Sequence, residues 1–214
     1  MLFRSQNVNA LRVLRGLGLL EPVLAAGFQM DERRFCDAVG NTVVGANALR
    51  TLDPKVPAIN NIPRPALHKI LTDAALAAGV RLRMNDTVAQ AADHGDAVEV
   101  ALQSGAAGRY DLVVGADGIR SPTRQRLFGL AGAPRFTGYG FWRINLPRFA
   151  SLDYIGIYQG TNGTKAGLVP LTQDTMYLFL VTNEPDNPVM PREKMVDLLR
   201  ERMAGYGGPV GDVR

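Results

Sequence analysis

The stretch DLVVGADGIRSPTRQRLFG, residues 111–129, constrains the fold of this chain more than any other. It begins as a continuous apolar run, which is typical of a strand buried on both faces of a sheet. The run ends in Asp117 and Gly118, and Arg120 and Ser121-Pro122 follow at once. Ligands of open α/β sheets bind beyond the carboxyl ends of the strands. The turn is therefore a candidate ligand site, and the alternative is a turn whose aspartate only satisfies nearby amides.

Composition excludes several classes of function. A chain of 214 residues fits one large domain or two small ones. Its net charge of +4 comes from basic residues interleaved with acids, so we expect no nucleic-acid partner. No apolar run approaches a membrane span and no leader-like segment opens the chain, which predicts a cytoplasmic protein without a membrane partner. Cys36 is the single cysteine, and His68 and His94 lie far apart, so we expect no metal site.

Hydrophobic periodicity and turn residues predict the elements. Helices are expected over 7–20, 64–80 and 191–203, and residues 34–52 read as a hairpin. The Pro-rich segment 53–63 reads as a connector. Strands are expected over the following ranges: 80–88, 97–103, 110–117, 140–147, 154–160, 166–171 and 175–183. The four strands after residue 136 are separated by short turns, which favours an antiparallel sheet.

The segment DLVVGADGIRSPTR resembles the Asp-Gly motif of the FAD-dependent aromatic-ring monooxygenases, the para-hydroxybenzoate hydroxylase family. Three other segments match that family in the same order: NALRVLRGLGLLEPVLAAG, IPRPALHKILTDAALAAGVRL and GYGFWRINLP. The resemblance implies an α/β fold in which part of a parallel FAD-binding sheet, with helices, joins an antiparallel substrate-side sheet. It assigns 1–30 and 61–135 to the FAD-binding part, and 31–60 and 136–214 to the substrate-binding part.

The resemblance also implies which residues hold the cofactor. Arg64 matches the arginine that opens a helix and touches the flavin cofactor, and its position at a helix start suits a diphosphate. Val88 matches a backbone position near the adenine, and Asp117 with Gly118 matches the turn that packs on the extended cofactor. No catalytic acid or base is identified, because the sequence shows no triad or carboxylate pair.

By this resemblance the chain belongs to an enzyme that uses FAD, NAD(P)H as electron donor and O2 to hydroxylate a small, activated aromatic ring. A flavin oxidoreductase or a halogenase of the same fold is one alternative. The other is a truncated, catalytically inactive fragment. The family's first Gly-x-Gly-x-x-Gly unit is not found, because GLGLLE at 16–21 lacks the third glycine, and GDVR at 211–214 matches the later Gly-Asp motif in two letters only. Substrate identity, the choice of nicotinamide and the oligomeric state are not predicted.

Overall fold

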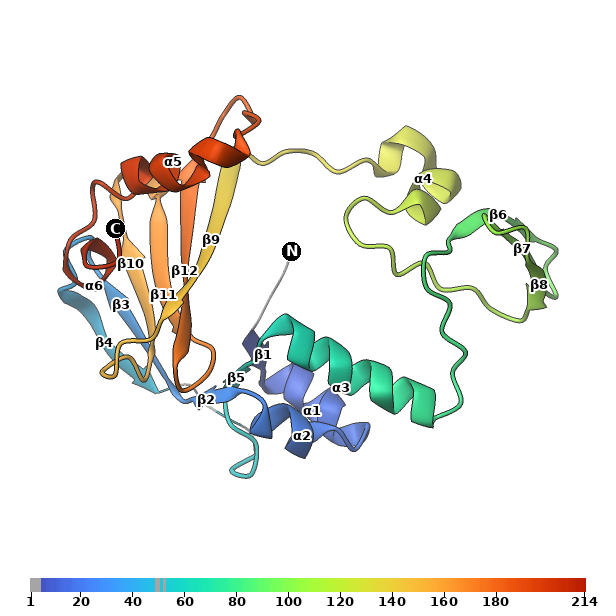
Figure 1. Cartoon of the computed structure of the whole chain (residues 1–214), viewed down its shortest axis with the longest axis horizontal. Coiled ribbons are helices and arrows are strands. Elements are labelled where there is room, and N and C mark those ends of the chain that lie inside the picture. Colours follow the sequence, from blue (N-terminus) through green and yellow to red (C-terminus); the bar gives the residue numbers. More distant parts are fainter. Residues whose placement is uncertain (1–4, 49–50, 52) are drawn as a thin grey trace. The chain divides into compact units, whose positions relative to one another are not determined.

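The computed structural model describes residues 5–48, 51 and 53–214, which divide into two compact units (Figure 1). The smaller unit spans Ala75–Arg135. The larger unit contains the described residues up to Ala74 together with Phe136–Arg214. The predicted division into a cofactor part and a substrate part stays a prediction, because compactness does not say what a unit binds.

The larger unit is built on a six-stranded sheet with the strand order β4-β3-β10-β11-β12-β9. Its strands are β3 (Glu32–Cys36), β4 (Thr42–Ala48), β9 (Tyr139–Pro147), β10 (Ile155–Gln159), β11 (Lys165–Pro170) and β12 (Thr175–Asn183). Neighbours are antiparallel except β10 and β3, which are parallel. The four strands predicted after residue 136 are confirmed, and so is the hairpin, whose turn contains Gly40 at φ 99°.

Helices α5 (Met195–Arg202) and α6 (Gly208–Gly211) cover one face of this sheet (Figure 1). The buried core beneath them contains Cys36, Trp142, Leu152, Tyr158, Ala166, Leu168, Met176, Leu178, Leu180, Leu199, Met203, Tyr206 and Val210. The helix predicted over 191–203 is confirmed from Met195, and its first residues, Arg192–Lys194, form a 3-10 turn. A further 3-10 turn, Thr161–Gly163, follows β10.

A partly buried ion pair joins α5 to the sheet. Glu184, directly after β12, is only 7% exposed. Its carboxylate accepts hydrogen bonds from Arg202 Nε at 2.5 Å and Nη2 at 3.0 Å, and from Thr182 Oγ1 at 2.8 Å. Thr182 in turn accepts a hydrogen bond from the indole Nε1 of Trp142 at 2.9 Å. The Arg202 guanidinium also lies 4.9 Å from the centroid of the Trp142 ring, so one network joins α5, β9 and β12.

A second, three-stranded antiparallel sheet belongs to the same unit. It consists of β1 (Ser5–Asn7), β5 (Ile59–Asn61) and β2 (Phe28–Met30), with β5 in the centre. The prediction of a connector over 53–63 is therefore wrong at its end. β5 was not predicted because asparagines are uncommon in strands. In the structure Asn60 is buried, and its Nδ2 donates a hydrogen bond to the Val23 carbonyl at 3.0 Å.

Three helices accompany this sheet. They are α1 (Val8–Gly16), α2 (Leu20–Ala25) and α3 (Arg64–Ala77). The helices predicted over 7–20 and 64–80 are confirmed by α1 and α3, whereas α2 was not predicted. The side chain of Asn7 caps α1, and Gly18, at φ 73°, follows its end. Leu11, Leu14 and Val23 are buried in a common core with Val56 and Ile62.

The smaller unit contains a three-stranded antiparallel meander and a short helix. The strands are β6 (Val88–Asp93), β7 (Val98–Leu102) and β8 (Ala107–Tyr110). Helix α4 (Pro122–Phe128) follows and runs into a 3-10 turn, Gly129–Gly132. The predicted strand over 97–103 is confirmed. The strand predicted over 80–88 is wrong, because only Val88 belongs to a strand.

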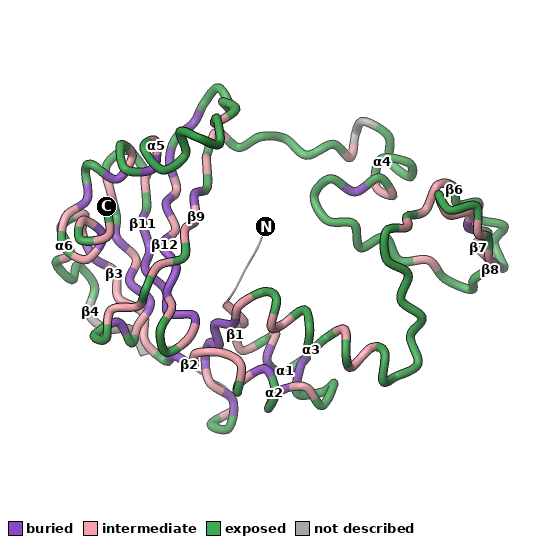
Figure 2. The backbone as a smooth tube through the Cα atoms, in the orientation of Figure 1, coloured by how far each residue is buried: buried purple, intermediate pink, exposed green. Residues whose placement is uncertain are grey.

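The apolar run 110–117 is also not the predicted buried strand. Only Tyr110 lies in a strand, and the following residues extend without ladder pairing. Leu112 and Val114 are 75% and 76% exposed, and most of the smaller unit is exposed in Figure 2. A parallel strand forms only against neighbouring strands, and the described residues offer none to this run. The α/β fold class is nevertheless confirmed, with helices and strands in one mixed and two antiparallel sheets.

Candidate functional site

The Asp-Gly turn is a compact, locally hydrogen-bonded structure. Asp117 Oδ2 accepts hydrogen bonds from Ser121 Oγ at 2.9 Å and from the Thr123 amide at 3.0 Å. The hydrogen bonds from Thr123 and Ser121 hold the pKa of the Asp117 carboxyl below its usual value. Ser121 also caps α4, because its Oγ accepts a hydrogen bond from the Arg124 amide at 3.0 Å. Asp117 therefore satisfies hydrogen-bond donors within its own turn, which is the structural alternative to a ligand-binding role.

The two glycines of this segment face different surroundings. A Cβ at Gly115 would lie 2.6 Å from Thr123 Cγ2, so the chain packs closely there. Gly118 has φ 79°, and a Cβ built on it would meet no atom within 4 Å. The backbone at Gly118 thus adopts the left-handed conformation that favours glycine and borders open space.

Helix α4 holds the turn and strand β6 together through two arginines. Arg124 donates to the carbonyl of Gly118 at 3.4 Å and to that of Ile119. Arg126 donates from Nη2 to the carbonyl of Val88 at 2.8 Å. Sequence reasoning missed the second contact, because its partners lie 38 residues apart and neither residue is unusual in its local pattern. Two predicted sites, Val88 and the Asp-Gly turn, are thereby held by one helix.

Arg64 lies elsewhere in the chain. It is the first residue of α3 and its side chain is exposed. It belongs to the larger unit, whereas the other three predicted residues, Val88, Asp117 and Gly118, belong to the smaller one. The structure therefore groups three of the four predicted cofactor residues in one unit, and it describes Arg64 separately at a helix N-terminus.

Val88 lines a cavity of about 780 Å³ in the smaller unit. Arg81, Arg83 and Arg109 line it together with Asp86, and Arg109 is paired with Asp96. Apolar residues of the exposed run complete it, among them Leu112 and Val114. A cavity that combines several guanidinium groups with apolar surface suits an anionic ligand that carries a flat apolar part.

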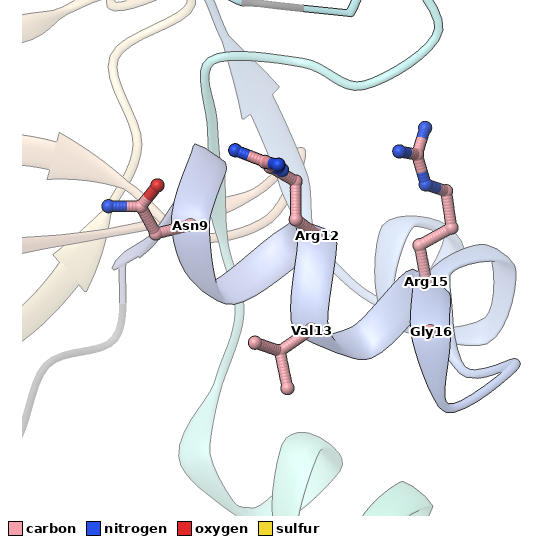
Figure 3. Close-up of a pocket in the computed structure, with 5 residues that line it drawn as sticks. All are labelled: Asn9, Arg12, Val13, Arg15 and Gly16. Carbon is pink, nitrogen blue, oxygen red and sulfur yellow. The ribbon is translucent and has the colours of Figure 1, made fainter.

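A second hollow lies along helix α1 (Figure 3). Its lining residues, Asn9, Arg12, Val13, Arg15 and Gly16, all come from this helix. Figure 3 shows Arg12 and Arg15 pointing to one side of α1 and Val13 to the other. Arg15 is paired with Asp53. Because the lining comes from a single helix, this hollow is a helix surface and not an enclosed site.

The described residues can also be searched for metal-binding groups and for membrane-spanning helices. Within residues 5–48, 51 and 53–214 there is no group of three or more histidine, cysteine, aspartate or glutamate residues placed to bind a metal ion. Across the same residues, no helix has the length and apolar character needed to cross a bilayer.

The sequence matches a known family over most of its length. The FAD binding domain family matches residues 4–198. The chain belongs to this family. A putative FAD-dependent monooxygenase, YetM of Bacillus subtilis, is 29% identical over 205 residues, which cover 95% of this chain and 55% of YetM. The 3-amino-4-hydroxybenzoate 2-monooxygenase of Streptomyces cremeus is 32% identical over 148 residues, covering 65% of this chain and 35% of that enzyme.

Solved structures share the fold of this chain. Klebsiella pneumoniae HpxO, solved with FAD and uric acid, superposes with a TM-score of 0.80 at 20% identity. The match covers 98% of this chain and 54% of HpxO. At this identity the likeness establishes the fold alone. The chain spans about half the length of the curated relatives that match nearly all of it.

Proposed function

We propose that this chain forms part of an FAD-dependent monooxygenase that uses NAD(P)H and O2 to hydroxylate a small aromatic ring in the cytoplasm. The observation that carries the proposal is the family match over residues 4–198, together with relatives that are named monooxygenases and hydroxylases. These names favour oxygen transfer over the reductase and halogenase alternatives.

The residues present fit FAD in three respects. Arg64 opens α3, a helix of 14 residues, where the helix dipole and a guanidinium both favour a diphosphate. Gly118 borders open space, so its backbone is accessible to an extended ligand. Val88 lines a cavity whose three arginines suit phosphate oxygens. The Val88 carbonyl already accepts a hydrogen bond from Arg126, so contact with the adenine falls to other atoms of this strand.

In this proposal each residue has a distinct task. Arg64 binds the diphosphate, the β6 segment around Val88 supports the adenine end, and the Asp-Gly turn packs on the extended cofactor. When bound, FAD would accept electrons from NAD(P)H and activate O2, while the protein would orient the aromatic ring and exclude water. The low pKa of Asp117 keeps this carboxyl ionised and bonded within its turn, which argues against a role as a proton donor.

The test is a titration of the purified chain with FAD, followed by quenching of flavin fluorescence. Arg64→Ala removes a charge-assisted hydrogen bond worth about 1.5–3 kcal/mol, so we expect the Kd to rise about tenfold or more. Lys69→Ala is the matched control, because Lys69 is an exposed cation on the same helix that pairs with Asp73. An equal change in both variants, or none in Arg64→Ala, would overturn the assignment of Arg64.

Activity is tested separately with the wild-type chain and added FAD. We expect NADH or NADPH to be oxidised in step with O2 uptake when a hydroxylated aromatic acid is present, and one atom of ¹⁸O to enter the ring from ¹⁸O2. Absence of saturable FAD binding contradicts the proposal for this chain. Flavin binding with NAD(P)H oxidation but without ¹⁸O in the ring would favour the oxidoreductase alternative.

A further inference from the structure

The smaller unit ends in a segment whose charged side chains are all positive. Between Asp117 and Asp153 the sequence contains arginines but no aspartate or glutamate. The arginines of this stretch that belong to the smaller unit are Arg120, Arg124, Arg126 and Arg135. Among the residues that the structure describes, no carboxylate forms an ion pair with any of these four. We call residues 118–135 the basic segment.

Large apolar side chains are exposed in the same segment. Ile119 is 65% exposed, Leu127 is 71% exposed and Phe128 is 64% exposed. Most of helix α4, which carries two of them, is exposed in Figure 2. Single exposed apolar side chains are ordinary on a protein surface, whereas a group of them marks an interaction site. Here they alternate with arginines along a short stretch of chain.

Local contacts hold the basic segment in a compact form. Arg124 and Phe128 are four residues apart on α4, so they are neighbours on the helix surface. A Cβ built on Gly132 would lie 3.2 Å from Arg124 Cγ and 3.3 Å from Phe128 Cβ, so the 3-10 turn packs back against this side of α4. The Arg124 guanidinium donates to the Ile119 carbonyl, which brings the preceding turn to the same side. The turn, the helix and the 3-10 turn therefore form one surface element.

The four positive charges of this element stay available to a ligand. Arg124 and Arg126 donate to backbone carbonyls, and such contacts orient a guanidinium without neutralising it. Arg120 and Arg135 are exposed. With no acid between residues 118 and 135, the segment has a formal charge of four arginines. A surface of this kind attracts a polyanion over about one Debye length, roughly 8 Å at physiological ionic strength.

The combination of arginines with aliphatic side chains favours a lipid surface over other polyanions. At an anionic membrane, basic residues bind the headgroups while apolar side chains enter the boundary between headgroups and acyl chains. Surfaces that bind single-stranded nucleic acids combine basic residues with aromatic rings that stack on bases. Ile119 and Leu127 are aliphatic and offer no such stacking. A surface contact with a bilayer also requires no helix that crosses it.

We infer that the basic segment binds the surface of anionic lipid bilayers. The arginines contact the phosphate and carboxylate groups of the lipids, and Leu127 and Phe128 enter the boundary region. The expectation of no membrane partner was based on the lack of a spanning segment, and a surface contact lies outside that argument. The inference is independent of the proposed function, because neither FAD nor an aromatic ring takes part in it.

Binding is measured by co-sedimentation of the full chain with lipid vesicles. One set of vesicles is phosphatidylcholine alone, and the other contains equal parts of phosphatidylcholine and phosphatidylserine. We expect partition onto the phosphatidylserine vesicles to be about tenfold stronger or more. Raising the salt to about 1 M shortens the Debye length to about 3 Å and should remove most of this preference.

Two double variants separate the charges from the apolar contact. Arg120→Gln with Arg135→Gln removes two exposed charges. Each basic residue near an anionic surface strengthens partition about fivefold, so we expect a loss of about twentyfold. Leu127→Ser with Phe128→Ser keeps every charge, and we expect partition to weaken about tenfold because the apolar contact is lost. Both pairs are exposed side chains, and circular dichroism establishes that the variants are folded.

The 3-10 turn before α5 supplies a matched control. Arg192→Gln with Lys194→Gln removes the same number of exposed charges. Exposed apolar side chains follow this turn as well, since Met195 and Val196 are 43% and 51% exposed. Acids lie among these residues, however, at Glu193 and Asp197. We therefore expect the control pair to change partition less than about twofold.

Four results would overturn the inference. One is equal partition of the wild-type chain onto the two kinds of vesicle. Another is a control pair that loses as much binding as Arg120→Gln with Arg135→Gln. The third is unchanged partition of Leu127→Ser with Phe128→Ser, which would reduce the contact to charge attraction alone. The fourth is displacement of the chain from the vesicles by a single-stranded oligonucleotide that requires the same two arginines, which would make a nucleic acid the partner. The FAD titration and the ¹⁸O assay use no lipid, so each proposal can fail while the other stands.

Discussion

The ion pair between Glu184 and Arg202 offers a test of what holds α5 on the sheet. Arg202→Met keeps much of the side-chain volume but leaves the Glu184 carboxylate without its cationic partner. Breaking a fully buried pair costs about 3–5 kcal/mol. The side chains of Arg202 and Glu184 are 22% and 9% exposed. Water therefore reaches part of the pair, and we expect a loss of about 2–3 kcal/mol in the free energy of unfolding.

Glu184→Gln should have a smaller effect. The amide retains an oxygen that accepts from Thr182 and Arg202, and the partly exposed guanidinium remains hydrated, so we expect about 1–2 kcal/mol. The double variant should be less destabilised than the sum of the two single variants, because neither partner is then left as an unpaired buried charge.

The stability that Glu184 contributes should decrease as the pH falls. The hydrogen bonds and charge of Arg202 lower the pKa of Glu184 in the folded chain. A carboxyl with a depressed folded pKa stabilises the fold above its unfolded pKa, about 4.3. That contribution disappears as the pH falls through the folded value. The stability difference between the wild type and Glu184→Gln should therefore be constant near pH 7 and shrink below about pH 4.3.

Trp142 provides the assay, since it is the single tryptophan of the chain and belongs to this network. Urea unfolding followed by its fluorescence reports on the unit that carries α5. Arg200→Met is a suitable control, because Arg200 lies on the same helix and forms an exposed pair with Asp197. A loss below about 0.5 kcal/mol in Arg202→Met, within the range of ordinary surface substitutions, would refute the reasoning. A stability difference for Glu184→Gln that does not change with pH would do the same.

Two glycine substitutions test other parts of the structure. A Cβ at Gly167 would lie 2.1 Å from Cε1 of Phe179, its register partner on β12, so Gly167→Ala should displace the Phe179 ring and lower the free energy of unfolding by about 1–3 kcal/mol. Unchanged stability in urea unfolding would contradict the close packing of this ring on β11. A Cβ at Gly118 meets no neighbouring atom, but Gly118→Val forces a β-branched residue to φ 79°. We expect about 1–2 kcal/mol of backbone strain and loss of bound flavin. Asp117→Asn should keep FAD and slow the reduction of FAD by NAD(P)H in stopped-flow experiments. Wild-type flavin content and reduction rates in both variants would leave the turn a purely structural element.

Sequence patterns predicted the elements that are stabilised within the chain itself. The strands after residue 136 alternate or are flanked by clear turns, and α3 has Pro65 at its start and Gly79 after its end. The strand β5 was missed because its residues are Ile-Asn-Asn, and asparagine becomes acceptable there only through tertiary hydrogen bonds such as that of Asn60. Local propensity does not contain such contacts.

The strand prediction for residues 111–116 was wrong for the opposite reason. Its side chains have the composition of a buried strand, but strand formation depends on partners that composition does not supply. For the candidate site, the sequence predicted Arg64, Val88 and the Asp-Gly turn, and the binding role of these residues stays a prediction. It did not predict the stacking of Phe141 on Phe179 or the position of Arg143 over the Phe141 ring. These contacts appear only once the register of β9 and β12 is known.

The exposed run Leu112–Ala116 has a consequence for the behaviour of the chain at high concentration. Extended apolar segments with unpaired backbone groups can serve as templates on which further copies assemble into intermolecular sheets. Asp111 and Asp117 border this run and act as charged gatekeepers against such assembly. The lowered pKa of Asp117 keeps one of these charges in place under mildly acidic conditions. We therefore expect the hydrogen bonds that shape the turn also to oppose self-assembly of the chain.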